Sequence, residues 1–215
     1  MFPKLYAIID ASLLTGSEAH CNASGLALAQ MLANSGVEVI QYRDKQSNSR
    51  RNYEVSLQFV RTLANSRAKF IVNDRPDIAL LSGAAGVHVG QTDLSVEDAR
   101  AICGADRIVG VSTHNLEQLA AADQTSADYI AFGPLFATST KQNPDPVVGL
   151  AGLRDARRLT RKPVVAIGGI TIERAAEVYA AGADSICVAR DLLCAPDPSA
   201  RAEEYLRIGA EAARP

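Results

Sequence analysis

Two cations and an amide alternate within the segment Gln41–Tyr42–Arg43–Asp44–Lys45. On an extended backbone, side chains two residues apart point to the same side, so Gln41, Arg43 and Lys45 are expected to share one face. An arginine fork grips phosphate oxygens in pairs and a lysine adds a compact positive charge, so this face suits a diphosphate. The competing interpretation is a solvated strand end held by salt bridges, and the segment alone favours neither.

Two carboxylates, Asp74 and Asp93, follow neighbouring apolar runs of the chain. If those runs are adjacent strands, the two carboxylates converge, and a carboxylate pair together with phosphate oxygens and water is a common way to hold Mg²⁺. The alternative is a helix cap or an ion pair, above all for Asp74 beside Arg75. Next to a cationic grip for a diphosphate, magnesium becomes the better interpretation.

Three consecutive hydroxyls and a lysine (Thr138, Ser139, Thr140 and Lys141) follow the apolar run 129–133. A strand of the core needs no such ending, which points to a ligand.

Two of the histidines lie in or near the apolar runs. His88 stands in the middle of one run and is expected to be a hydrogen-bonded core histidine rather than a catalyst. For His114, at a predicted helix start, a capping role and a catalytic role stay equally open. No Ser/His/Asp or Cys/His arrangement indicates a covalent nucleophile.

Eight short apolar runs must position these residues. They are continuously apolar, which is typical of parallel strands covered on both faces. Alanine- and leucine-rich segments with helical spacing lie between them. The runs are 5–10, 38–42, 69–74, 86–90, 107–112, 129–133, 163–169 and 185–191.

Several signals mark the helices. Segments 25–36 and 171–182 each close on a glycine, and Ser95 begins a capping-box-like start. The short connection after the third run predicts only a stub of helix over 76–82. Segment 11–24 shows no clear pattern.

Strand and helix repeated eight times without a linker predict a single (β/α)8 TIM barrel, and we expect residues 1–215 to form one catalytic domain of this kind. A doubly wound open sheet is the alternative, but it more often has five or six strands and a glycine-rich turn after the first. In a barrel the chemistry gathers at the carboxyl ends of the strands. Nearly every run ends in polar residues at this position. Gly168–Gly169, at the end of the seventh run, would let backbone N–H groups approach a phosphate.

Composition narrows the classes of protein. The chain is 47% apolar and 21% charged with a formal net charge of −2, which argues against a broad nucleic-acid-binding surface. Its four cysteines form no CxxC pair and are expected to be reduced thiols. No apolar run reaches the roughly 18 residues of a membrane span. We therefore expect a cytoplasmic protein that binds neither membrane nor nucleic acid. A homo-oligomer is compatible with the sequence, because an apolar patch on outer helices would look like core.

Taken together, these motifs resemble the thiamine-phosphate synthase family from Leu5 to about Leu193. The resemblance rests on QYRDK (41–45), VNDR (72–75), GVHVGQTDL (86–94), GVSTHN (110–115), GPLFATSTK (133–141), PVVGL (146–150) and AIGGI (166–170).

The resemblance implies an enzyme that joins a hydroxymethylpyrimidine diphosphate to a thiazole phosphate, or its carboxylated form, and gives thiamine phosphate and pyrophosphate. It implies Mg²⁺ on Asp74 and Asp93. It implies catalytic roles, through the diphosphate and its departure, for Arg43, Lys45, Ser112 and Lys141. The residues assigned to substrate binding are Gln41, Tyr42, Arg43, Asp44, Lys45, Asn73, Ser112, Thr138, Ser139, Thr140, Lys141, Gly169, Ala189 and Arg190.

The implied mechanism is dissociative: pyrophosphate leaves first, and the thiazole nitrogen captures the resulting methylene cation. One stretch departs from the family pattern, in which a small apolar residue and a serine follow the eighth strand. Here Ala189 and Arg190 stand there. We expect Arg190 to bind the thiazole phosphate in place of the serine, the alternative being an ion pair with Asp191.

Two other functions compete. A thiazole tautomerase-like paralogue would share the barrel but would not need a diphosphate grip with paired carboxylates. A non-catalytic phosphate-binding barrel would be expected to have lost part of its charged rim.

Overall fold

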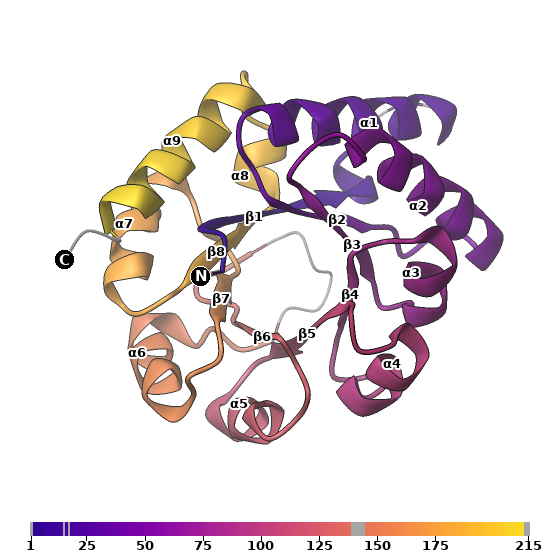
Figure 1. Ribbon diagram of the computed structural model, residues 1–215. Helices are drawn as coiled ribbons and strands as arrows, with labels where there is room; N and C mark the ends of the chain where they lie inside the picture. The colour runs from indigo at the N-terminus through magenta and orange to yellow at the C-terminus, as the bar shows by residue number, and fades with distance from the viewer. Residues whose placement is uncertain (1, 15, 17, 139–144, 213–215) are drawn as a thin grey trace.

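Eight parallel strands close into a barrel in the computed structural model, which describes residues 2–14, 16, 18–138 and 145–212. β1 (Leu5–Asp10) pairs with β2 (Val39–Arg43) on one side and with β8 (Ser185–Val188) on the other. An open sheet would leave two edges unpaired, so the doubly wound alternative is excluded and the predicted TIM barrel is confirmed. Figure 1 shows the ring of strands with the helices wrapped around its outside.

Each of the eight apolar runs forms a strand, and the ends differ from the prediction by a few residues where polar side chains begin. The remaining strands are β3 (Lys69–Asn73), β4 (Gly86–Val89), β5 (Ile108–Thr113), β6 (Tyr129–Phe132) and β7 (Val164–Ile167).

The helices follow the strands in chain order. Their bounds are η1 (Ala11–Leu13, a 3₁₀ turn), α1 (Glu18–Asn34), α2 (Ser49–Leu63), α3 (Pro76–Ser82), α4 (Val96–Cys103), α5 (Leu116–Asp123), α6 (Gly149–Leu159), α7 (Ile172–Ala180), α8 (Arg190–Leu193) and α9 (Pro198–Ala212).

Two helix predictions are confirmed and one is corrected. α3 is a stub of seven residues, and Ser95 caps α4 by accepting a hydrogen bond from the Asp98 amide at 3.1 Å. α1 begins at Glu18, inside the segment 11–24 that showed no pattern. That stretch has few large apolar residues, so hydrophobic periodicity does not mark it.

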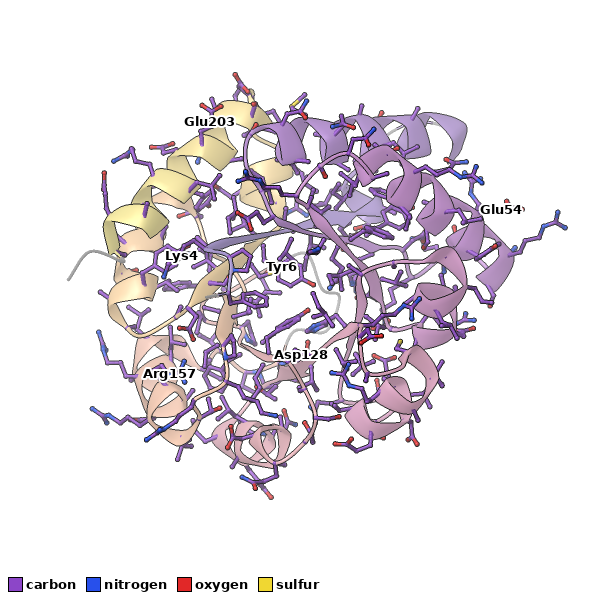
Figure 2. The ribbon with its side chains drawn as sticks, in the orientation of Figure 1. Lys4, Tyr6, Glu54, Asp128, Arg157 and Glu203 are labelled. Atoms are coloured by element: carbon purple, nitrogen blue, oxygen red, sulfur yellow. The ribbon has the colours of Figure 1, made fainter. Side chains whose placement is uncertain are left out.

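The core has two layers, one on each side of the strands. Outside the barrel, Phe59 of α2 stacks on Phe70 of β3, with ring centroids 4.9 Å apart. Inside the barrel a second cluster includes Tyr6, Ile71 and Tyr129. Figure 2 shows Tyr6 pointing into the barrel, whereas Glu54 lies on an outer helix. Side chains of one strand therefore serve the two layers alternately.

Three of the four cysteines, Cys103, Cys187 and Cys194, are free thiols; the side chain of Cys21 lies outside those described. Helix α9 packs between α7 and α1 and completes the outer ring (Figure 1). Within the described ranges, no helix has the length and apolar character needed to span a bilayer.

Candidate active site

A cavity of about 590 Å³ lies at the carboxyl ends of the strands, and residues from all eight strand ends line it. This is the end of the barrel where the sequence places the chemistry. The predicted site residues that line it are Gln41, Arg43, Lys45, Asn73, Asp74, Asp93, Ser112, Thr138, Gly169, Ala189 and Arg190.

Tyr42 and Asp44 are not among the residues that line the cavity, and their assignment as substrate contacts stays a prediction. The alternation of β2 turns the Tyr42 ring outward, where it packs on Phe59 with centroids 4.9 Å apart. Asp44 shapes the following turn by accepting hydrogen bonds from the Gln46 amide at 2.9 Å and from the Ser47 hydroxyl at 2.7 Å. These hydrogen bonds outweigh the effect of burial and lower the pKa of Asp44.

Three predicted residues, Ser139, Thr140 and Lys141, lie outside the described residues.

Arg43 is held by a carboxylate that sequence reasoning missed. Asp10, at the end of β1 and only 2% exposed, accepts a hydrogen bond from Arg43 Nη1 at 2.6 Å. The Ser12 amide and hydroxyl also donate to Asp10, at 2.9 and 2.6 Å. With its carboxylate fixed from both sides, Asp10 orients the guanidinium at the cavity wall. The feature of the sequence that could have revealed Asp10 is an acidic residue at the end of the otherwise apolar run 5–10.

Asp74 and Asp93 face each other, with Lys45 as the ion-pair partner of Asp74. Burial raises the pKa of Asp74; the hydrogen bond from Lys45 opposes that rise, and the neighbouring Asp93 carboxylate adds to it. Asp93 also accepts a hydrogen bond from the Gly90 amide at 2.8 Å. Two carboxylates this close repel each other, so a cation between them would be stabilised.

The backbone at Asp74 is unusual. Its φ of 62° is the one positive value among the described non-glycine residues, and strain of this kind concentrates at functional sites. Across the described part of the chain, no group of three or more His, Cys, Asp or Glu side chains could hold a metal.

The loop between β7 and α7 brings backbone close to the cavity. Gly168 and Gly169 have φ values of 101° and 62°, which L side chains rarely adopt. A Cβ on Gly168 would lie 2.5 Å from the Cα of Pro134, so the loop requires glycine for space as well as for conformation.

Arg174 is a second residue that sequence reasoning missed. It lies in the first turn of α7, lines the cavity and donates to the carbonyl oxygen of Gly169 at 2.7 Å. Its guanidinium also lies over the Phe136 ring, 4.4 Å from the centroid. The feature of the sequence that could have revealed Arg174 is a cationic residue in the first turn of the helix that follows the two glycines.

Arg190 does not pair with Asp191, which was the alternative to phosphate binding. Asp191 instead accepts from Arg201 at 3.0 Å and from the Tyr205 hydroxyl at 2.7 Å. Among the described residues the exposed Arg190 guanidinium has no hydrogen-bond partner, and it lines the cavity beside Ala189.

The two histidines are both held by hydrogen bonds. His88 is buried, as predicted, with Nδ1 2.9 Å from the Tyr129 hydroxyl and Nε2 2.8 Å from Ser112 Oγ. Burial lowers the pKa of His88 to about 4, so the ring is neutral at pH 7. His114 Nδ1 donates to the Gly133 carbonyl oxygen at 2.7 Å, and its Nε2 lies 3.4 Å from an Asp145 oxygen. His114 thus joins β5 to the connection that follows β6.

A family model described as thiamine monophosphate synthase matches residues 6–192 of this chain. The chain belongs to the thiamine monophosphate synthase family. This confirms the resemblance read from the strand-end motifs.

Thiamine-phosphate synthases from other organisms are similar to this chain over nearly its full length. A thiamine-phosphate synthase of Koribacter versatilis is 49% identical over 206 residues, which cover 96% of this chain and 95% of that protein. One from Shouchella clausii is 38% identical and covers 98% of each. A solved structure of thiamine phosphate pyrophosphorylase from Pyrococcus furiosus superposes with a TM-score of 0.85 at 32% identity, covering 98% of this chain and 97% of that one. The expected enzyme class, a transferase, is confirmed with the family.

Proposed function

We propose that this protein joins a hydroxymethylpyrimidine diphosphate to a thiazole phosphate, forming thiamine phosphate and releasing pyrophosphate. Family membership supports thiamine-phosphate synthase activity, and the cavity supports these two substrates. The observation that carries the proposal is a pair of anion-binding sides in one cavity. Arg43, Lys45 and the facing carboxylates come from β2 to β4, while the glycine loop and Arg190 come from β7 and β8. In an eight-stranded ring β3 lies across from β7, so two phosphorylated molecules would meet between them.

The pyrimidine diphosphate is assigned to the side formed by β2 to β4. Asp10 binds one edge of the Arg43 guanidinium, at 2.6 Å from Nη1, which leaves the rest of the fork for phosphate oxygens. Gln41, Asn73 and Ser112 line the same part of the cavity with neutral polar groups. Lys141, which lies outside the described residues, is assigned to the diphosphate by its place in the family motif.

Mg²⁺ is proposed as the cofactor, held by Asp74 and Asp93. The fit rests on the chemistry of the site: burial raises the pKa of Asp74, and the neighbouring Asp93 carboxylate raises it further, so a cation at this pair would be stabilised. Two carboxylate ligands completed by phosphate oxygens and water suit Mg²⁺. When bound, the ion would neutralise negative charge that develops on the departing pyrophosphate.

The thiazole phosphate is assigned to the side formed by β7 and β8. The backbone amides of the Gly168–Gly169 loop, Thr138 and the guanidinium of Arg190, which has no partner among the described residues, suit a phosphate dianion. Ser139 and Thr140, outside the described residues, are assigned to the same phosphate by the family motif.

The proposed chemistry is a substitution at the pyrimidine methylene carbon. The carbon–oxygen bond to the diphosphate breaks with both electrons leaving on oxygen, and the thiazole nitrogen then forms the new carbon–nitrogen bond. No side-chain nucleophile is needed. Arg43, Lys45 and Ser112 would stabilise the leaving anion, and the apolar side chains of Ile8, Ile167 and Val188 would exclude water from the cation.

A thiazole tautomerase-like activity and a non-catalytic phosphate-binding barrel are both disfavoured. Neither function would need the charged residues that the chain retains on the side of the cavity formed by β2 to β4. We also propose a cytoplasmic protein, with which the free thiols of the described cysteines agree. A homo-oligomer stays a prediction.

The test mixes purified protein with both substrates, with and without Mg²⁺, and measures thiamine phosphate and pyrophosphate. We expect coupling only with the metal, and a fall in turnover of at least about a hundredfold in Asp93→Asn, because an aligned charge-neutralising group is typically worth that much. Asp98→Asn, on the surface of α4, is the matched control and should keep its turnover. Absence of coupling under all metal conditions, with both substrates bound, would refute the proposal.

A further inference from the structure

A continuous chain of hydrogen bonds crosses the barrel beneath the cavity. Gln41 Nε2 donates to the Tyr6 hydroxyl at 2.7 Å, and the Tyr6 and Tyr129 hydroxyls lie 2.9 Å apart. Tyr129 lies 2.9 Å from His88 Nδ1, and His88 Nε2 lies 2.8 Å from Ser112 Oγ. We name these five residues the relay. Its two ends, Gln41 and Ser112, both line the cavity.

The relay is built into the barrel rather than added at its rim. Tyr6 and Tyr129 are 1% and 0% exposed and stand on β1 and β6, so the step between them spans the barrel interior. Gly110 of β5 makes room for the Tyr129 ring, because a Cβ there would lie 2.0 Å from Tyr129 Cζ. Apolar neighbours such as Val165 surround the two rings, where phenylalanine would pack as well. Packing alone therefore does not require the two hydroxyl groups, and we expect them to have another role.

All three inner members are buried, and their side chains have only uncharged hydrogen-bond partners among the described residues, which favours the neutral form of each. Burial also raises the pKa of both tyrosines above the ordinary value of a phenol. Each tyrosine then carries one hydroxyl hydrogen, and the imidazole carries a hydrogen on one nitrogen and a lone pair on the other.

The first bond sets the direction of the others. Because Gln41 donates to Tyr6, the Tyr6 hydrogen is free to be donated, and Tyr129 is the hydroxyl within reach. Tyr129 then donates to His88 Nδ1, so the imidazole carries its hydrogen on Nε2 and donates to Ser112 Oγ. In the reverse direction Tyr6 would accept twice, and its own buried hydrogen would have no acceptor among the described residues, which is costly.

We propose that Tyr6, Tyr129 and His88 are positioning residues that set Ser112 as a hydrogen-bond donor toward the anionic substrate in the cavity. Because Ser112 Oγ accepts from His88 with one lone pair, its hydroxyl hydrogen points elsewhere and can be donated to a ligand that accepts. At the other end, Gln41 uses one amide hydrogen on Tyr6, which fixes the amide plane so that its oxygen can accept from a ligand that donates. The relay thereby selects a substrate with an acceptor at Ser112 and a donor at Gln41. The identity of that substrate, a pyrimidine diphosphate, rests on the proposed function.

The direction of the relay is measured in the free protein, without any substrate. Nitrogen NMR of ¹⁵N-labelled protein should show His88 as the neutral tautomer with hydrogen on Nε2. In Tyr129→Phe the preference should be lost, because Nδ1 no longer receives a hydrogen bond. Tyr179→Phe is the matched control: its hydroxyl donates to the Lys4 carbonyl oxygen at 2.6 Å, outside the relay, so His88 should not respond. A wild-type His88 with hydrogen on Nδ1 would overturn the proposal.

The action through Ser112 is measured by a double-mutant cycle on kcat/KM for the pyrimidine diphosphate. We expect Tyr129→Phe to lower it about tenfold, as for loss of one aligned hydrogen bond, with the KM of the thiazole substrate unchanged within about twofold. In a Ser112→Ala background the same change should cost less than about twofold, since it acts through the missing hydroxyl. Tyr6→Phe should lower kcat/KM in the same way as Tyr129→Phe, and Tyr179→Phe should leave kcat/KM unchanged.

Equal costs of Tyr129→Phe in both backgrounds would show a merely structural role and would overturn the proposal. If the wild-type protein failed to couple the substrates, the proposed function would fall, whereas the NMR result would still decide the relay.

Discussion

At the scale of single residues, the two cations of the β2 end that face the cavity are each held by a carboxylate from a neighbouring strand end. Asp10 of β1 holds Arg43 of β2, and Lys45 pairs with Asp74, which follows β3. A guanidinium that is already oriented loses less side-chain entropy when phosphate binds. We therefore expect Asp10 and Asp74 to assist binding by orienting Arg43 and Lys45, although their own charges repel an anionic substrate.

Asp10→Asn tests this orientation. The amide keeps the shape of the side chain but loses the charge that holds Arg43, so we expect the KM of the pyrimidine diphosphate to rise about tenfold with a smaller change in kcat. Steady-state kinetics with the thiazole substrate saturating would measure it. Asp77→Asn is the control, because Asp77 forms a comparable pair with Arg75, at 2.5 Å, outside the cavity. An unchanged KM in Asp10→Asn would show that Arg43 needs no partner.

At the scale of elements, the connections after the strands differ in what they require of the backbone. The β7–α7 loop packs against the segment that follows β6: the Phe136 amide donates to the Gly168 carbonyl oxygen at 3.0 Å. This contact, with the positive φ of both glycines, leaves no space for a side chain at the loop. The loop is therefore shaped by the neighbouring connection as well as by its own residues.

Gly168→Ala should damage the loop more than backbone strain alone explains. The added Cβ would meet Pro134 at 2.5 Å, so the loop must move, and we expect the KM of the thiazole phosphate to rise at least about tenfold. Gly83→Ala is the matched control, since Gly83 also has positive φ (75°) but has no atom within 4 Å of its Cβ position. That change should cost only about 1 kcal/mol of stability, measured by chemical denaturation, and leave KM unchanged. Equal kinetics in the two variants would contradict a packed phosphate loop.

At the scale of the whole molecule, closure of the barrel turns strand ends from distant parts of the chain into two walls of one cavity. β3 and β7 are four positions apart in the ring, so the carboxylate pair and the glycine loop face each other. In the proposed function each wall would bind one substrate, and the cavity between the walls would hold the reacting atoms together, which is a large part of the rate advantage of a two-substrate enzyme.

This division predicts variants that are selective for one substrate. Lys45→Ala should raise the KM of the pyrimidine diphosphate about tenfold and leave that of the thiazole phosphate nearly unchanged, because a single phosphate contact is lost. Arg190→Ala should do the reverse. The KM of each substrate, measured with the other substrate saturating, tests whether each wall binds one substrate. An Arg190→Ala variant with an unchanged thiazole-phosphate KM would remove Arg190 from the site.

The sequence by itself determined the barrel, the family and most of the strand-end residues. This was possible because continuous apolar runs mark buried parallel strands, and because polar residues that end such runs must meet at one rim. The alternation of β2 was also in the sequence. It separates Gln41, Arg43 and Lys45, which line the cavity, from Tyr42 and Asp44, which do not, whereas the resemblance counts all five as substrate contacts.

Only the tertiary structure decided which partner each polar group has. Asp10 next to Arg43, Arg174 over Phe136, and the hydroxyls of Tyr6 and Tyr129 joined across the barrel are contacts between residues far apart in the chain. In the sequence nothing about these residues indicates which partner each will have. The direction of a hydrogen bond depends on the distance and angle between two groups, and the closure of the barrel sets both.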